Sequence, residues 1–208
     1  MENINNDNYD ILIKFSDYVD DIKKGLFFCH NLNYFRKADP STGLGDSEEG
    51  MIFTPKKTIQ LDGNKVFLFC MLALEPTEIN SLNNTGFFKL SESQIKKFKI
   101  FGGQHSLCIN ECDSLIQEIN AYCETKNIKV LSNYVTYADR HNLSLAKKKS
   151  IFANEYKAAF IKPTEYSWQR EFRFLFYNVP DNLINDDHII LNIEDFHTPS
   201  YICKNVFN

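Results

Sequence analysis

Polar side chains recur at every second position in the segment from Trp168 to Phe174. We predict a strand over residues 168–177, in which Gln169, Glu171 and Arg173 point to one face because side chains alternate across a strand. Such a row of polar groups can line a cleft. It can equally form the solvent face of an antiparallel strand, with the charges paired across to neighbouring strands. The sequence leaves both interpretations open.

The segment from His30 to Gly50 is a second candidate site. Tyr34 and Phe35 precede Arg36, and a planar guanidinium suits a phosphate or pyrophosphate because it donates two parallel hydrogen bonds. The acidic residues of the following loop can bind a divalent cation or orient a ribose hydroxyl; they are Asp46, Glu48 and Glu49. A solvated turn that uses its glycines for positive φ explains the same residues.

A third candidate is Gly102-Gly103-Gln104-His105. Two glycines let a backbone approach a ligand closely, and His105 can titrate near neutrality. A single histidine at the start of a strand is also an ordinary structural residue. The histidines at positions 141, 188 and 197 form no pattern of metal ligands.

Composition restricts the class of protein. The chain of 208 residues predicts one domain, and 18 Phe and 10 Tyr beside a single Trp predict an aromatic, sheet-rich core. The six cysteines show no Cys-x-x-Cys pair, which indicates reduced core thiols. The longest apolar run, residues 66–74, is about half the roughly 20 residues that span a bilayer. We therefore expect a cytoplasmic protein without a membrane partner.

The formal net charge of −4 argues against a general nucleic-acid binder, because that function normally requires a basic face. We predict an α+β fold of one domain over residues 1–208, with mostly antiparallel sheets and a few short helices. A split two-sheet sandwich is one such arrangement. We expect residues 1–8 to be a frayed start, and 38–50 and 138–150 to be long loops.

Hydrophobic periodicity and capping residues place the individual elements. The predicted strands are 9–15 at a sheet edge, 58–61, 65–74 at a central position, 105–109, 128–137, 168–177, 188–193 and 200–207. The predicted helices are a short one capped by Ser16, one over 91–98 with a Ser91/Gln94 capping box, one over 113–125, and one over 151–161.

Three motifs resemble those of a family of uncharacterised bacterial and phage proteins. They are Gly25-x-x-Phe28-x-x-x-Leu32-x-Tyr34-Phe35-Arg36, Gly45-Asp46-x-x-Glu49-Gly50 and Gln169-x-Glu171-Phe172-Arg173. The resemblance covers most of the chain and implies no activity.

Gln169-Arg170-Glu171 also resembles the Gln-x-Glu motif of ADP-ribosyltransferases, which places a glutamate against the nicotinamide ribose of NAD. In that fold two small sheets hold NAD in a cleft. The chain lacks the arginine on the first strand and the Ser-Thr-Ser motif of one branch of those enzymes. The His-Tyr-Glu pattern of the other branch can be filled by His30, by Tyr134 or Tyr137, and by Glu171.

The resemblance implies an NAD-dependent ADP-ribosyltransferase-like enzyme, as found among toxins and phage-defence effectors, that modifies a macromolecular acceptor. Glu171 and Gln169 would be catalytic, and Arg36, Tyr34, His30 and Tyr137 would bind NAD or a similar nucleotide. One alternative is a metal-dependent nuclease or phosphodiesterase that uses the acidic loop with His105 as base. The other is a non-enzymatic module or inhibitor that contacts a protein partner through Tyr34, Phe35 and the acidic loop.

Overall fold

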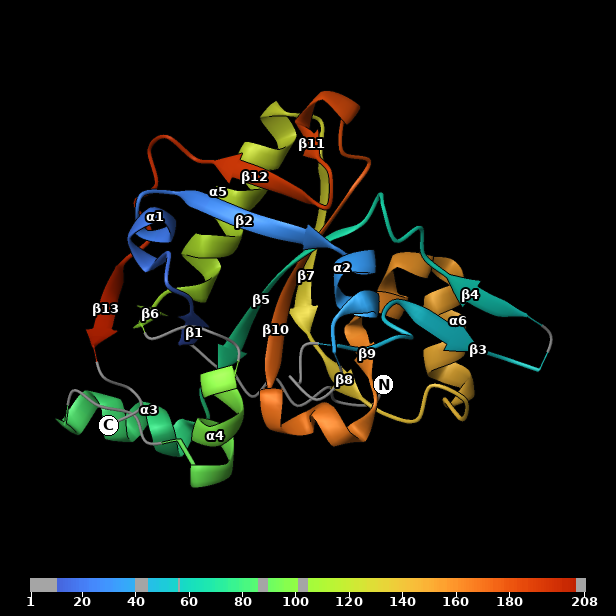
Figure 1. Ribbon diagram of the computed structural model, residues 1–208, viewed down its shortest axis with the longest axis horizontal. Coiled ribbons are helices and arrows are strands. Elements are labelled where there is room, and N and C mark those ends of the chain that lie inside the picture. The colour runs from blue at the N-terminus through green and yellow to red at the C-terminus, as the bar shows by residue number, and fades with distance from the viewer. Residues whose placement is uncertain (1–10, 40–44, 56, 86–89, 101–104, 205–208) are drawn as a thin grey trace.

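A forked antiparallel sheet forms the centre of the molecule (Figure 1). The computed structural model describes residues 11–39, 45–55, 57–85, 90–100 and 105–204. Among these residues, nine strands make up the sheet: β1 (Leu12–Phe15), β2 (Leu26–Asn31), β5 (Phe67–Ala73), β6 (His105–Ile109), β7 (Lys129–Tyr134), β10 (Glu171–Tyr177), β11 (Ile184–Asn185), β12 (His188–Asn192) and β13 (Ser200–Lys204).

The remaining elements lie around this sheet. Two short ladders pair β3 (Met51–Phe53) with β4 (Thr58–Gln60) and, in parallel, β8 (Thr136–Tyr137) with β9 (Ile161–Lys162). The helices are α1 (Val19–Lys23), α2 (Leu32–Lys37), α3 (Pro76–Thr85), α4 (Glu92–Ile100), α5 (Cys112–Thr125) and α6 (Leu145–Ala153), with 3₁₀-helices η2 (Glu155–Phe160), η3 (Thr164–Gln169) and η4 (Asp181–Leu183). These elements confirm the predicted α+β class. No helix of the described residues is long and apolar enough to cross a membrane.

Strand β5 is the branch point of the sheet, which confirms its predicted central position. On one side it pairs along its length with β10. On the other side its first residues, Phe67 and Leu68, pair with β2, whereas Leu72 and Ala73 near its end pair with β1. Strands β1 and β2 therefore diverge along residues 69–71 and leave a fork in the sheet.

Strand β1 is not an edge strand as the alternating pattern of residues 9–15 predicted. It lies between β5 and β6, and both Leu12 and Ile13 are fully buried although they point to opposite faces. The prediction was wrong because a central strand buries both faces, and the four residues of β1 are too few to show this in the sequence.

The predicted elements around residue 160 need correction. The segment 138–150 is not wholly a loop, because Ser144 caps α6 by accepting a hydrogen bond from Lys147 N, and the helix begins at Leu145. The predicted helix 151–161 is divided at Asn154, whose extended backbone ends α6 and whose side chain caps η2. The predicted strand 168–177 begins only at Glu171, because residues up to Gln169 form η3.

The predicted cap of the first helix by Ser16 was wrong, because α1 begins at Val19 with Tyr18 at the N-cap position, and Ser16 instead accepts a hydrogen bond from Tyr18 N. Local signals gave several other elements correctly. The Ser91/Gln94 capping box forms as predicted, with reciprocal hydrogen bonds at the start of α4. The predicted strand 105–109 is β6, and α5 agrees with the predicted helix to within one residue. Residues 205–207 of the last predicted strand lie outside the described residues.

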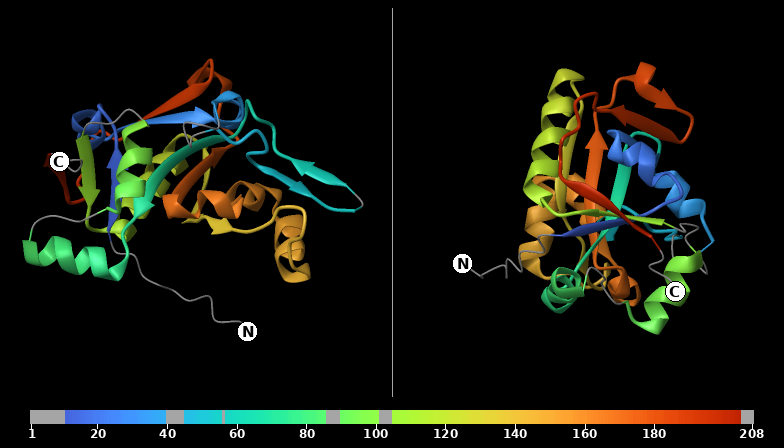
Figure 2. Two further views of the ribbon diagram at one scale, coloured as in Figure 1. Left: turned by 60° about the horizontal axis from the view of Figure 1, so that its bottom comes forward. Right: turned by 90° about the vertical axis from the view of Figure 1, so that its left-hand side faces the viewer.

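An aromatic core fills the space between the sheet and α5, which packs along one face of the sheet (Figure 2). Phe172, Phe174 and Phe176 of β10 point into this core, towards Leu115 and Ile119 of α5. Because side chains alternate along a strand, the opposite face of β10 carries Glu171 and Arg173. The phenylalanine row thus fixes the direction in which the two charged side chains point.

Gly25 joins α1 to β2 with a φ of +89°, and a Cβ at this position would lie 2.1 Å from the carbonyl oxygen of Ile193. We expect Gly25→Ala to destabilise the fold by about 1–3 kcal/mol, because it adds backbone strain and displaces the Ile193 backbone from its hydrogen bond to Gly25 O. Urea unfolding measures the change. Lys24→Ala at the exposed neighbour is the control, and equal stability of Gly25→Ala and wild type would contradict the argument.

Candidate functional site

Three segments that are far apart in the sequence meet beside the start of β10. Asp46 N donates a hydrogen bond to Phe35 O at 3.0 Å, and Arg36 Nε donates to Glu49 O at 2.8 Å. Arg173 Nη1 in turn donates to Glu49 Oε1 at 2.7 Å. The residues of the Tyr-Phe-Arg, Gly-Asp-x-x-Glu-Gly and Gln-x-Glu-Phe-Arg motifs therefore form one structural unit.

Arg173 is the centre of a buried ion network. Its side chain is 1% exposed and binds the fully buried Glu49 in a bidentate pair, at 2.7 and 3.0 Å. Its Nε also donates to Glu171 Oε1 at 2.6 Å, and its Nη1 donates to the backbone oxygen of Ala159. One guanidinium thus holds two buried carboxylates and the η2 backbone.

Lys162 supplies the second cation of this network. Its ammonium donates to Glu171 Oε2 at 3.0 Å and to Gln169 Oε1 at 2.7 Å, and it lies 3.9 Å from Glu49 Oε2. Strand β9 brings Lys162 to this position by its parallel pairing with β8. Two cations and two carboxylates balance, which explains how the network tolerates burial.

The Glu171 carboxylate stays ionised because of these neighbours. Burial alone would raise the pKa of Glu171, but the Arg173 and Lys162 cations outweigh it and hold that pKa well below the ordinary range. A permanent negative charge therefore lies at the first residue of β10. This is the protonation state that a carboxylate needs to stabilise a developing positive charge.

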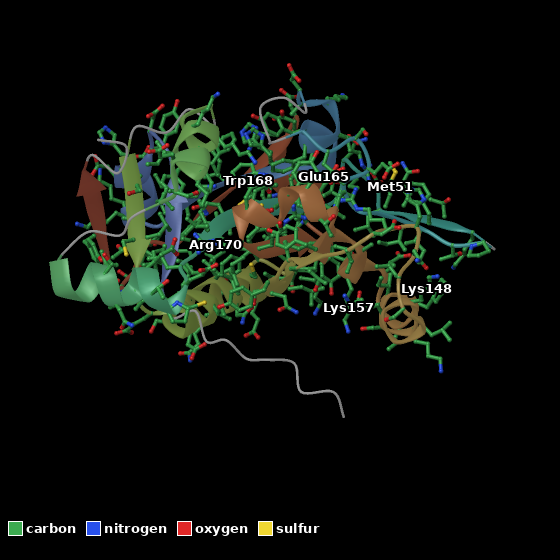
Figure 3. The ribbon with its side chains drawn as sticks, turned by 90° about the horizontal axis from the view of Figure 1, so that it is seen from below. Met51, Lys148, Lys157, Glu165, Trp168 and Arg170 are labelled. Carbon is green, nitrogen blue, oxygen red and sulfur yellow. The ribbon has the colours of Figure 1, made fainter. Side chains whose placement is uncertain are left out.

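The Gln169-Arg170-Glu171 motif turns the chain from η3 into β10. Arg170 adopts a left-handed conformation with a φ of +41°, and its guanidinium points to α3, where it donates to both carboxylate oxygens of Glu78 at 2.6 and 2.9 Å. Figure 3 labels Trp168 and Arg170 at this turn and Glu165 earlier in η3. The turn lets Gln169 and Glu171 share Lys162 while Arg170 points away.

The fork between β1 and β2 opens into a pocket of about 780 Å³, which we call the fork pocket. Its walls come from residues 13–18 around β1, residues 68–72 of β5, Phe28 and His30 of β2, Tyr34 and Phe35 of α2, and Lys162, Gln169 and Glu171. This volume falls within the usual range of small-molecule sites. Four predicted site residues, Glu171, Gln169, His30 and Tyr34, line this pocket together.

The His30 and Tyr34 rings stack on each other, with centroids 3.6 Å apart and an interplanar angle of 9°. The stack is positioned by Asn31, which caps α2 by accepting a hydrogen bond from Tyr34 N. Burial lowers the pKa of His30, so its imidazole is neutral at pH 7. The pair gives the pocket a flat, uncharged aromatic wall.

Arg36 and Tyr137 do not line the fork pocket among the described residues. Arg36 uses its guanidinium to hold the chain around Gly50 and Gly63, by donating to Glu49 O, Leu61 O and Asn33 Oδ1. The Tyr137 hydroxyl lies behind Glu171 and accepts a hydrogen bond from its backbone N–H. The structure therefore places both as supports of the pocket wall.

Two of the three carboxylates of the acidic loop are held by arginines, and the third, Glu48, is partly exposed and lies 3.9 Å from Arg140 Nη1. Asp46 is buried and forms a bidentate pair with Arg140, and Glu49 pairs with Arg173 as described. No group of three or more His, Cys, Asp or Glu among the described residues could hold a metal ion. His105 is exposed at the start of β6, and the glycines before it lie outside the described residues.

Tyr34 and Phe35, the aromatic residues expected at a contact with a protein partner, are both partly buried. Tyr34 stacks on His30 inside the fork pocket, and Phe35 packs in part against the core cluster around Leu32 and Ile52. Neither ring belongs to the exposed large hydrophobic residues of the described chain.

Sequence reasoning missed two lysines that line the fork pocket, Lys14 and Lys162. Both lie in short strands, β1 and β9, and neither belongs to a sequence motif. A lysine by itself does not mark a binding site, so the sequence did not single them out. Their roles depend on contacts with residues brought near by the fold, such as Cys70 for Lys14.

Comparison with known proteins gives no relative. No protein-family model, no curated protein and no solved structure matches this chain. A functional assignment must therefore come from the geometry of the fork pocket and from the motif at Gln169-Arg170-Glu171.

Proposed function

We propose that the chain is an NAD-dependent ADP-ribosyltransferase-like enzyme with Glu171 as its catalytic carboxylate. The observation that supports this most strongly is the convergence of Glu171, Gln169, His30 and Tyr34 on one pocket. The resemblance implies six site residues, and these four line the pocket whereas Arg36 and Tyr137 support its wall from outside. Gln169 and Tyr34 are separated by most of the chain.

The chemistry fits the charge state of Glu171. When the bond between nicotinamide and ribose breaks, nicotinamide leaves with the bonding electrons and the ribose develops oxocarbenium character. A fixed carboxylate stabilises that positive charge, and it can also accept a hydrogen bond from a ribose hydroxyl. Gln169 orients the nucleophile of the acceptor, which then forms the new bond to the ribose carbon.

The aromatic wall supports the same ligand. The His30–Tyr34 stack is flat and uncharged, and offset stacking on such a wall is favourable for a ring such as nicotinamide. In this arrangement Tyr34, and not Tyr134 or Tyr137, completes the His-Tyr-Glu set. Tyr134 packs against Phe172 on the opposite face of β10.

The test is to incubate the purified protein with NAD and to quantify released nicotinamide by chromatography. We expect release by wild type and its loss in Glu171→Gln. Water can replace the missing acceptor in this assay, so no macromolecular target is needed. Unchanged NAD after prolonged incubation with wild type at high protein concentration would count against the proposal.

A further inference from the structure

Lys14 lies at the fork of the sheet, on β1, which is one of the two strands that diverge there. Its ammonium donates a hydrogen bond to Cys70 O at 2.9 Å, in the stretch of β5 that neither β1 nor β2 pairs. It also lies 4.5 Å from the centre of the Phe69 ring. These contacts fix a cationic side chain on the wall of the fork pocket.

No described carboxylate lies within ion-pair distance of the Lys14 ammonium. Glu171 acts on it from farther away, and the carboxylates of Asp17 and Asp21 line the same pocket. The nearby thiols of Cys29 and Cys70 are uncharged, since burial raises the pKa of both. Lys162 in the same pocket is paired with Glu171 at 3.0 Å. A half-buried ammonium without a carboxylate in contact is costly, and an ammonium has three donors, of which Cys70 O accepts one.

The mouth of the pocket is apolar. Tyr18, Phe28 and Ile190 line the pocket and remain 72%, 46% and 45% exposed, which places them among the exposed large hydrophobic residues of the described chain. Phe28 and Ile190 face each other across β2 and β12 as register partners. Exposed apolar side chains that gather at one cavity indicate a binding surface.

We infer that the fork pocket binds an amphipathic organic anion, whose anionic group is held by Lys14 and whose aromatic or apolar group packs on Phe28 and Ile190. The inner cation and the apolar mouth each restrict the ligand, and together they favour one molecule that carries both features. The inference concerns the pocket of the proposed function, but it requires neither that NAD is the substrate nor that Glu171 is catalytic.

A fluorescent aromatic sulfonate, 8-anilinonaphthalene-1-sulfonate, is a suitable probe because it combines an anion with apolar rings. We expect saturable binding with a stoichiometry of one. Lys14→Met should weaken binding at least about tenfold, since a hydrogen bond to a charged group contributes about 1.5–3 kcal/mol. Lys14→Arg keeps the charge and should retain most of the affinity.

Phe28→Ser tests the apolar end at an exposed position where the fold should tolerate the change, and we expect weaker binding there too. Lys57→Met is the matched control, because Lys57 lies 5.1 Å from the exposed Phe152 ring outside the fork pocket. Each variant is first shown to unfold cooperatively. If Lys14→Met does not fold, Lys14→Arg and Phe28→Ser still report on the site.

The inference is overturned if the probe binds Phe28→Ser as tightly as it binds wild type and, where Lys14→Met folds, binds that variant as tightly too. It is also overturned if Lys57→Met weakens binding of the probe as much as the pocket variants do. Competition separates this inference from the proposed function. Displacement of the probe by NAD supports both, whereas Lys14-dependent binding that NAD does not reduce supports the anion site and contradicts the NAD proposal.

Discussion

Glu171→Gln is expected to reduce nicotinamide release from NAD by about 10²–10³-fold, the range seen when one electrostatic contact to a transition state is removed. The amide has nearly the same size as the carboxylate and can still accept a hydrogen bond from Lys162. Arg173 keeps its bidentate partner Glu49. The variant therefore loses the negative charge beside the ribose, and it also loses the hydrogen bond from Arg173 Nε, because an amide nitrogen cannot accept it. Cooperative unfolding of the variant is therefore shown before its rate is compared.

The matched control for this prediction is Glu165→Gln, an exposed glutamate on η3 that makes the same chemical change outside the fork pocket. Initial rates at saturating NAD separate loss of chemistry from loss of binding. We expect Glu165→Gln to release nicotinamide at the wild-type rate. Wild-type turnover in Glu171→Gln would remove Glu171 from the mechanism.

Arg173→Met is expected to destabilise the fold by about 3–5 kcal/mol, because it leaves buried carboxylates without their main counter-ion. Glu49 and Glu171 would both remain in the interior, with Lys162 as the nearest cation at 3.9 and 3.0 Å. The hydrogen bond to Ala159 O would also be lost. Methionine keeps an unbranched apolar stem but not the guanidinium, so part of the effect comes from the space that the guanidinium leaves.

Urea unfolding followed by circular dichroism measures this loss. Lys65→Met is the control, since Lys65 forms an exposed ion pair with Asp181, and such pairs add little to stability. We expect its unfolding midpoint to match that of wild type. A similarly small change in Arg173→Met would mean that the buried network is not needed to hold β10, η2 and the acidic loop together.

Local sequence patterns were sufficient for elements that their own residues determine. The apolar run of β5 indicated a strand buried on both faces, and the Ser91/Gln94 pair indicated the start of α4. They failed where short elements depend on distant contacts. Strand β1 has only four residues, and its central position follows from pairing with both β5 and β6.

In the candidate site too, the sequence identified some residues correctly and failed where a residue's role depends on distant contacts. Residue types and one short motif were enough to single out Glu171, Gln169, His30 and Tyr34, which the fold brings to one pocket. Arg36 is also a residue that can bind an anion, but its guanidinium donates hydrogen bonds to the backbone oxygens of residues 49 and 61. No local pattern distinguishes an arginine that binds a ligand from one that holds a loop.

Isothermal calorimetry of the purified protein with NAD tests most directly whether the fork pocket is a dinucleotide site. We predict saturable binding of NAD to wild type. Tyr34→Ala should weaken the binding because it removes one of the two rings of the aromatic wall, and the Glu165→Gln control should bind NAD as tightly as wild type. The absence of heat at millimolar NAD, or equal affinity in Tyr34→Ala, would contradict binding of NAD against the His30–Tyr34 stack.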